Sequence, residues 1–272
     1  MIRPPAVNGH FYPKDGLALS NQIQDFLDVA DCSALTAEAI NPIKGLISPH
    51  AGYLYSGLTA AHGFKAIEGQ DIETAIIIGP SHHISFEGVS IFDGSFYETP
   101  LGLIPIETSL AQELIFSVPN YNFFKAAHEK EHSIEVQLPF LQVLGVPNIL
   151  SVIMGSKNPN PKELADSIIE HADPEKTIII ASSDFSHFYN SATSQKMDAL
   201  ALETIKNNDI DQLLKLSEQK KIEMCGLHPI ITLLLIMKAW NANNQKTLHS
   251  TNSGKVSGDT SRVVGYNSLA FY

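Results

Sequence analysis

Short runs of consecutive apolar residues alternate along this chain with longer segments in which apolar positions recur every three or four residues. The short runs are rich in β-branched residues and carry no polar alternation, which is typical of strands covered on both faces. They predict buried strands at 43–48, 74–79, 148–154 and 177–182.

The longer segments have the spacing of amphipathic helices. They predict helices at 16–30, 109–118, 161–172, 194–207 and 229–240. Turn residues interrupt 89–106, which predicts antiparallel excursions there, and two late runs, 247–251 and 263–272, predict closing strands. The alternation of strands and helices favours an α/β fold: a single domain over 1–272 with a central, partly parallel mixed sheet flanked by helices.

The composition argues against several classes of protein: nucleic-acid-binding, membrane-spanning and disulfide-rich. The chain has 272 residues, of which 44% are hydrophobic and 17% charged, and its formal net charge is −11. An acidic chain without a basic stripe is a poor candidate for nucleic-acid binding. No apolar run approaches the roughly 18 residues of a membrane span, and the N-terminus lacks the pattern of a signal peptide. With only two cysteines, a disulfide framework is not expected, so we expect a cytoplasmic protein.

Histidines follow three of the predicted buried strands at the point where each strand ends. His50 follows the first, His82 and His83 follow the second, and Asp184 and His187 follow the fourth. In open α/β sheets ligands bind outside the carboxyl ends of the strands, so these side chains are expected to line one crevice. Since consecutive residues of an extended chain point in opposite directions, only one of the paired histidines should face it.

Cys225 stands just before the predicted helix at 229–240, in the sequence "EMCGLHPIITLLL". The positive end of a helix lowers the pKa of a nearby thiol, and a thiolate is a good ligand for soft or borderline metals. The alternative is a small buried core residue, and the local sequence leaves both open.

The stretch "HEKEH" at 128–132 matches the zinc-protease pattern H-E-x-x-H, which requires both histidines on one stable helix. Its flanks lack the apolar side of such a helix, and Ser133 resembles the N-cap of a new helix. We therefore expect His128 on the surface, while His132 and Glu135 enter the crevice from the start of the new helix.

Six segments together resemble the Memo-like (MEMO) family: "RPPAVNGHFYP", "ISPHAGYLYSG", "IGPSHH", "EHSIEVQLPFL", "SSDFSHF" and "CGLHPI". They occur in family order and span residues 3 to about 230. The family is similar in fold to class III extradiol dioxygenases, which open catechol rings with non-haem iron, so the resemblance implies an extradiol-dioxygenase-like domain.

The resemblance also implies site residues and partners. His50, His82 and Cys225 match the metal positions of the family, Asp184 and His187 match neighbouring polar positions, and Tyr53 is expected to line the pocket. Because cysteine replaces the carboxylate ligand of the extradiol enzymes, iron or copper is expected in preference to zinc. Association with a radical-SAM protein and an AMMECR-type protein is implied by the resemblance alone.

Three hypotheses for function result. The first is an iron- or copper-dependent oxidoreductase of unknown substrate, in which His187, oriented by Asp184, moves protons and His132 assists. The second is a non-catalytic module that binds a small molecule or a peptide, since a fold does not assign an activity. The third is a zinc peptidase acting through 128–132.

Overall fold

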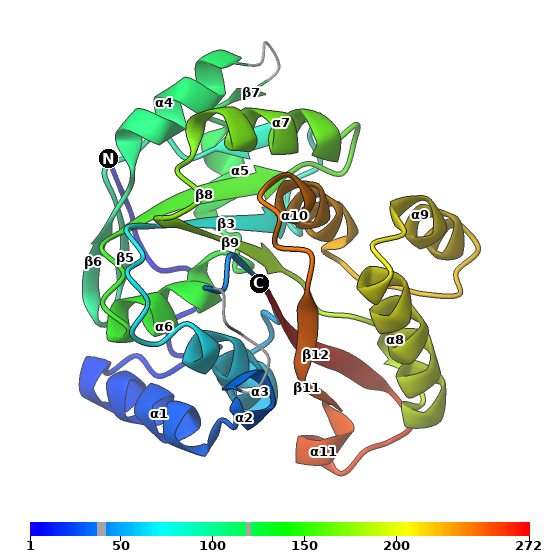
Figure 1. Ribbon diagram of the computed structural model, residues 1–272. Helices are drawn as coiled ribbons and strands as arrows, with labels where there is room; N and C mark the ends of the chain where they lie inside the picture. Colours follow the sequence, from blue (N-terminus) through cyan, green and yellow to red (C-terminus); the bar gives the residue numbers. More distant parts are fainter. Residues whose placement is uncertain (37–41, 118–120) are drawn as a thin grey trace.

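A mixed β-sheet forms the centre of the computed structural model, which describes residues 1–36, 42–117 and 121–272 (Figure 1). Four parallel strands make up the middle of this sheet, in the order β2, β9, β3, β8. They are β2 (Gly45–Ser48), β9 (Thr177–Ser182), β3 (Thr74–Pro80) and β8 (Asn148–Met154). All four predicted buried strands are thus confirmed.

Further strands, most of them in antiparallel pairs, extend the parallel centre on both sides. The added strands are β12 (Val263–Phe271), β11 (Gln245–Asn252) and β10 (His187–Tyr189) beyond β2, and β4 (Val89–Ile91) and β7 (Tyr121–Asn122) beyond β8. A separate small sheet contains β1 (Ile2–Arg3), β5 (Phe96–Thr99) and β6 (Gly102–Pro105). The antiparallel strands expected in 89–106 and in the C-terminal region are confirmed.

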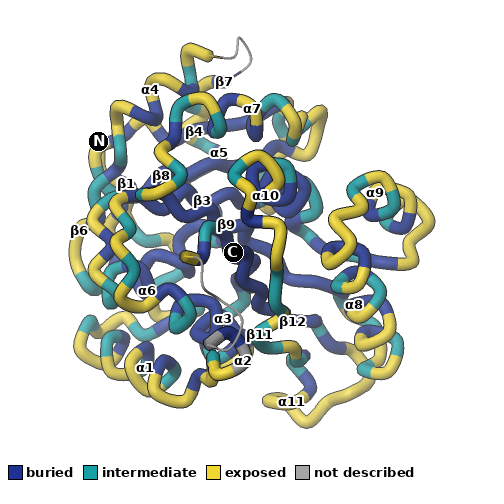
Figure 2. The backbone as a smooth tube through the Cα atoms, viewed as in Figure 1, coloured by how far each residue is buried: buried dark blue, intermediate teal, exposed yellow. Residues whose placement is uncertain are grey.

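Both faces of the sheet are buried, as the unbroken apolar runs predict (Figure 2). Along β3, Ile76 and Ile78 belong to one hydrophobic cluster, while Ala75 and Ile77 belong to the cluster on the opposite face. Side chains alternate across a strand, so a strand with a core on each side must be apolar at every position.

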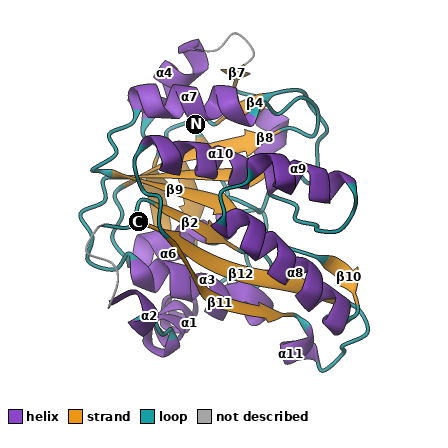
Figure 3. Ribbon diagram, turned by 45° about the vertical axis from the view of Figure 1, so that its right-hand side comes forward, coloured by secondary structure: helices purple, strands orange, loops and turns teal. Residues whose placement is uncertain are grey.

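Two layers of helices cover these faces (Figures 1 and 3). One layer contains α1 (Gly16–Val29), α2 (Ser33–Thr36), α3 (Tyr53–Ala66) and α6 (Leu138–Val143). The other contains α4 (Thr108–Ser117), α7 (Pro161–His171), α8 (Ser191–Lys206), α9 (Ile210–Glu218) and α10 (Leu227–Ala239). Short helical turns, α5 (Lys125–Glu129), η1 (Glu135–Gln137) and α11 (Gly254–Ser257), lie in connections. The predicted helices are confirmed, and so is the α/β class with flanking helices.

Helix α3 was not predicted, because it is buried on nearly all sides and therefore lacks an amphipathic stripe. Small residues let its neighbours approach closely. A Cβ atom at Gly57 would lie 2.5 Å from the ring of Phe26 in α1, and one at Gly63 would lie 2.8 Å from Ser268 Oγ in β12. Its sequence therefore lacks the polar face, opposite an apolar one, that is the main signal of a surface helix.

The N-terminal segment is fastened to the core through Glu135, which is fully buried. Its carboxylate pairs with the Arg3 guanidinium, accepts the N–H groups of Ala6 (2.8 Å) and Val7 (3.0 Å), and accepts the Tyr12 hydroxyl (2.5 Å). A buried carboxylate needs such donors to offset its loss of hydration. Glu135 thus has a structural role in place of the predicted contact with substrate.

Among the residues that the structure describes, no helix combines the length and the apolar composition needed to cross a lipid bilayer.

Candidate metal centre

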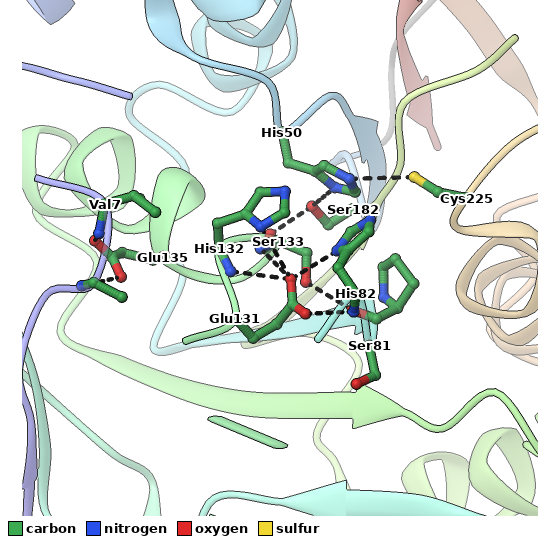
Figure 4. A network of polar contacts seen from close by, with 12 residues as sticks. Val7, His50, Ser81, His82, Glu131, His132, Ser133, Glu135, Ser182 and Cys225 are labelled. Atoms are coloured by element: carbon green, nitrogen blue, oxygen red, sulfur yellow. Dashed lines mark hydrogen bonds and ion pairs between the residues drawn. The ribbon is translucent and has the colours of Figure 1, made fainter. Parts of the chain in front are cut away.

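Three histidine rings meet at the carboxyl end of the parallel strands (Figure 4). His50 follows β2 and His82 follows β3, and their ring centroids are 5.1 Å apart. His132 comes from the loop before η1, and its centroid lies 5.4 Å from that of His50 and 4.5 Å from that of His82. Each ring offers one nitrogen, and these three nitrogens lie within 4.8 Å of one another.

The loop that carries His132 is tied to the end of β3. Ser133 Oγ donates to the carbonyl of Pro80 at 3.1 Å, so it does not act as the predicted helix N-cap. A Cβ atom at Gly79 would collide with Ser133 Oγ, and only glycine permits this approach. The loop therefore holds His132 against His82.

Hydrogen bonds determine which nitrogen of His50 carries its proton. The Ser182 hydroxyl donates its single proton to the carbonyl of Ser133 (2.6 Å) and accepts from Gln137 Nε2 (2.8 Å). Its 2.9 Å contact with His50 Nδ1 must then be one in which the ring donates. Burial lowers the pKa of His50, so the ring is neutral, and this network assigns its lone pair to Nε2.

A buried carboxylate, Glu131, orients His82 in the same way. Its oxygens accept the backbone N–H groups of His82 (2.6 Å), His132 (3.0 Å) and Ser133 (2.9 Å). They also lie 2.8 Å from His82 Nδ1. Although burial by itself raises the pKa of Glu131, the His82 contacts outweigh it and hold that pKa well below its usual range. The ionised carboxylate makes Nδ1 the donor, which leaves His82 Nε2 free as a ligand atom.

Cys225 lies beside His50, with its sulfur 3.2 Å from His50 Nε2. The N–H of Asp184 donates to the same sulfur at 3.3 Å. Burial, together with the Asp184 carboxylate, raises the pKa of the Cys225 thiol. The predicted lowering of this pKa by the start of α10 is therefore wrong, because the thiol is desolvated and next to a carboxylate. The neutral thiol has a single proton, and two acceptors lie within reach of it: the free lone pair of His50 Nε2 at 3.2 Å and the Asp184 carbonyl at 3.5 Å.

Asp184 and His187 lie close to this cluster but do not pair with each other in the hydrogen bonds observed. The Asp184 carboxylate accepts the N–H of His50 at 2.8 Å, and burial raises its pKa to about 7. His187 Nδ1 lies 3.2 Å from the Glu223 carboxylate instead. We expected Asp184 to orient His187, but the partner of His187 in the structure is Glu223. Burial lowers the pKa of His187, so its imidazole is neutral near pH 7.

Comparison with known proteins agrees with this arrangement of motifs. A family model described as "Memo-like protein" matches residues 3–270. The chain belongs to the Memo-like family. A MEMO1 family protein of Methanobrevibacter smithii is 38% identical over 283 residues, with 100% of each chain covered. MEMO1 family proteins of Nitrosopumilus maritimus (32% over 274 residues, 100% of each) and Aquifex aeolicus (33% over 276 residues, 99% of each) are also similar.

Tyr53 of this Memo-like protein lies in the hydrophobic core. Its hydroxyl donates to the carbonyl of Val136 at 2.7 Å, and its ring is 3% exposed and packs against Tyr12, Phe26 and Phe140. The predicted role in lining a substrate pocket is not supported, because the polar end of the side chain is already hydrogen-bonded inside the protein.

His83 lies on the outer side of the cluster, as the alternation argument expects for one of the paired histidines. It could form a second group of ligand atoms with Glu131 and His132. However, Glu131 Oε1 already accepts from the His82 ring and from the N–H groups of His132 and Ser133, and Oε2 accepts the N–H of His82, so a cation here would compete with four hydrogen bonds. This second group is therefore a poorer site for a cation than the three-histidine group.

His128 is buried, contrary to the expectation that it lies on the surface. Its Nε2 lies 3.0 Å from Ser90 Oγ and its Nδ1 lies 3.0 Å from the Tyr97 hydroxyl. Helix α5 ends at Glu129, so His128 and His132 do not share a helix face. The zinc-peptidase hypothesis is contradicted, since its two histidine ligands are held apart in different environments.

The sequence analysis missed four residues of this network. Glu131, Ser182 and Glu223 contact predicted site residues, and Gln137 supports Ser182. Glu131 and Ser182 each adjoin a segment already singled out, at 128–132 and at the end of the fourth strand. An acidic or hydroxyl side chain next to a candidate ligand is a usable signal for a hydrogen-bond partner of that ligand.

Removing the Ser182 hydroxyl tests the assignment of the His50 proton. In Ser182→Ala the Nδ1–H loses its acceptor, so we expect long-range ¹H–¹⁵N NMR of metal-free protein to change from one tautomer to a mixture. Metal affinity should fall roughly 10–100-fold, the usual effect of losing such a partner. Ser156→Ala, which removes an exposed hydroxyl, is the matched control. An unchanged His50 spectrum in Ser182→Ala would contradict the assignment.

Burial of His128 predicts acid sensitivity. Burial lowers its pKa from 6.5 to about 3, so below pH 6.5 the unfolded chain binds a proton that the folded chain does not. The free energy of unfolding should therefore decrease as the pH falls from 6.5 towards 3. Replacing this group in His128→Gln should reduce the slope by up to about 1.4 kcal/mol per pH unit, measured by urea denaturation at several pH values. A slope as steep as that of the wild type would contradict this origin.

Proposed function

We propose that this Memo-like protein binds a transition-metal ion between His50, His82 and His132 and acts as a metal-dependent oxidoreductase. The observation that carries the proposal is the meeting of three imidazole nitrogens within 4.8 Å at the carboxyl end of the sheet. Three such nitrogens from separate segments have few other uses, and imidazole is the commonest metal ligand in proteins.

The donor atoms have the chemistry that a metal ion requires. A ligand histidine must be neutral, and its second nitrogen is normally held by a hydrogen-bond partner. His50 has Ser182 as this partner and His82 has Glu131. Burial also lowers the pKa of His132, to about 4, which keeps it neutral at physiological pH.

Cys225 is proposed as a further ligand that joins once a metal ion displaces its proton. Its sulfur lies next to His50 Nε2, although it is outside the group of three nitrogens. Imidazole and thiolate together favour iron or copper over harder cations. When bound, such an ion would supply one-electron and oxygen chemistry. The proposed relation to class III extradiol dioxygenases rests on the motifs alone.

His187 is proposed as the proton-transfer group of this site. It is neutral near pH 7, partly exposed, and hydrogen-bonded to Glu223, so it can accept a proton and the neighbouring carboxylate then stabilises its charge. Its charge would act on the metal cluster as well, since it contributes to the low pKa of His50.

Cobalt(II) titration of metal-free protein, followed by visible absorption, tests the ligand set. We expect His50→Ala and His82→Ala to lose more than roughly 100-fold in affinity, because loss of a ligand should exceed loss of its hydrogen-bond partner. His132→Ala should also weaken binding, and Cys225→Ser should abolish the thiolate-to-cobalt absorption band while binding persists. His10→Ala, at an exposed histidine, is the control. Equal affinity in all variants would contradict the proposal.

Oxygen uptake separates an oxidoreductase from a binding module. Protein loaded with iron(II) or copper and supplied with catechol should consume oxygen, and His187→Gln should reduce the rate by roughly 10²–10⁴-fold at unchanged metal content, the usual contribution of a general base. Tight metal binding without oxygen uptake for a range of reductants would favour the alternative, a module that binds a small molecule or a peptide.

A further inference from the structure

Phe188 combines two unfavourable features at the edge of the metal site. Its φ is +64°, a conformation that is rare and costly for a bulky side chain, and its ring is 62% exposed. The residue lies at an irregularity between His187 and Tyr189, where β10 pairs with β12. Strain of this kind persists only where the surrounding structure imposes it, and it concentrates at functional sites.

Arg262 lies over this ring, with its guanidinium carbon 5.1 Å from the ring centroid. The chain contains only two arginines. Arg3 is buried and paired with Glu135, whereas Arg262 is exposed and directly precedes β12. Among the described residues no ion pair includes Arg262. It contributes to the low pKa of Asp259, but the hydrogen bonds from Ser261 are the main cause of that shift.

His187 flanks the same ring, at a centroid distance of 6.0 Å. The Phe188 ring is thus bordered by Arg262 and by the proposed proton-transfer group. The Glu223 carboxylate lies beside His187 and is hydrogen-bonded to His187 Nδ1. Figure 3 shows β10 at the margin of the sheet, beside α8, and the Phe188 side chain there is exposed.

We propose that Phe188 and Arg262 form a recognition site for a small aromatic carboxylate. The guanidinium holds the carboxylate through paired hydrogen bonds and the ligand ring packs on Phe188, which places it next to His187. In a chain with net charge −11, an unpaired guanidinium beside the site is a local attraction for an anion. The inference rests on the proposed function, because it names the class of substrate for that site.

Arginine suits this role better than lysine would. Its planar, rigid fork matches a carboxylate in two hydrogen bonds and can stay stacked on an aromatic ring while it does so. The exposed ring provides the apolar surface that an aromatic ligand would cover. Strain at Phe188 is then the cost of directing this ring outward beside His187.

Benzoate and its uncharged analogue benzamide are the probes, titrated into the metal-free chain and monitored by NMR shifts of Phe188, His187 and Arg262. We expect benzoate to bind at these residues and benzamide to bind about tenfold more weakly. Arg262→Gln should weaken benzoate binding about tenfold and remove its preference over benzamide. Lys238→Gln, at an exposed lysine in the last turn of α10, should leave both affinities unchanged.

Phe188→Asn distinguishes recognition from a purely structural role, since asparagine tolerates a left-handed backbone. We expect weaker benzoate binding with a melting temperature no lower than that of the wild type. A lower melting temperature with unchanged benzoate binding would overturn the proposal. So would benzoate affinity that is unchanged in Arg262→Gln, or benzoate-induced NMR shifts only at residues far from Phe188. Cobalt(II) titration of the same variants separates the two proposals. Normal metal binding without benzoate binding would contradict only this inference, and benzoate binding without metal binding would contradict only the metal site.

Discussion

The geometry of the candidate metal centre depends on one buried carboxylate, Glu131. A charged oxygen pair with 1% exposure survives in a protein only if donors surround it, and here the donors are the backbone of His82, His132 and Ser133 together with the His82 ring. Satisfying Glu131 therefore joins the end of β3 to the loop before η1. Two of the three ligand rings gain their positions from that requirement.

His50 and Cys225 form a second part of the site, in which both groups are neutral. His50 and Cys225 are held in contact where burial disfavours charge on both, so the metal-free pair consists of an imidazole and a thiol. Binding of a cation by the sulfur would release a proton, which couples metal affinity to pH. The nearby carboxyl group of Asp184, with a pKa near 7, is placed to respond to that change in charge.

Rigid and strained parts of the site are separated in space. His50 and His82 follow strands of a sheet that is covered on both faces (Figure 2), and the loop of His132 is hydrogen-bonded to the end of β3. These supports hold the three rings in fixed relative positions. The exposed ring of Phe188 lies instead on the short strand β10 at the margin, and the Arg262 guanidinium, from the residue before β12, lies over it. Preorganised ligands in the interior and an accessible margin are the arrangement expected when a bound ion must be met by a molecule from solvent.

The sequence by itself determined the α/β fold, because strands with a core on both sides must be apolar throughout, and it identified the strand ends at His50 and His82 as one site. It failed where partners come from distant segments. His128 appeared to be a surface residue, yet Ser90 and Tyr97 bury it. Tyr53 and Glu135 belong to the same sequence motifs as the site residues, but both side chains are buried and hydrogen-bonded within the core.

Tertiary structure alone decided these outcomes, because burial and hydrogen-bond partners depend on residues far apart in the chain, such as His50 and Cys225, which are 175 positions apart. It also decided the carboxylate partner of His187, which is Glu223, and the direction of the Cys225 pKa. Local sequence reports the type of a chemical group and the spacing of its neighbours. The protonation and the availability of that group are set by the electrostatic environment, which exists only after the chain has folded.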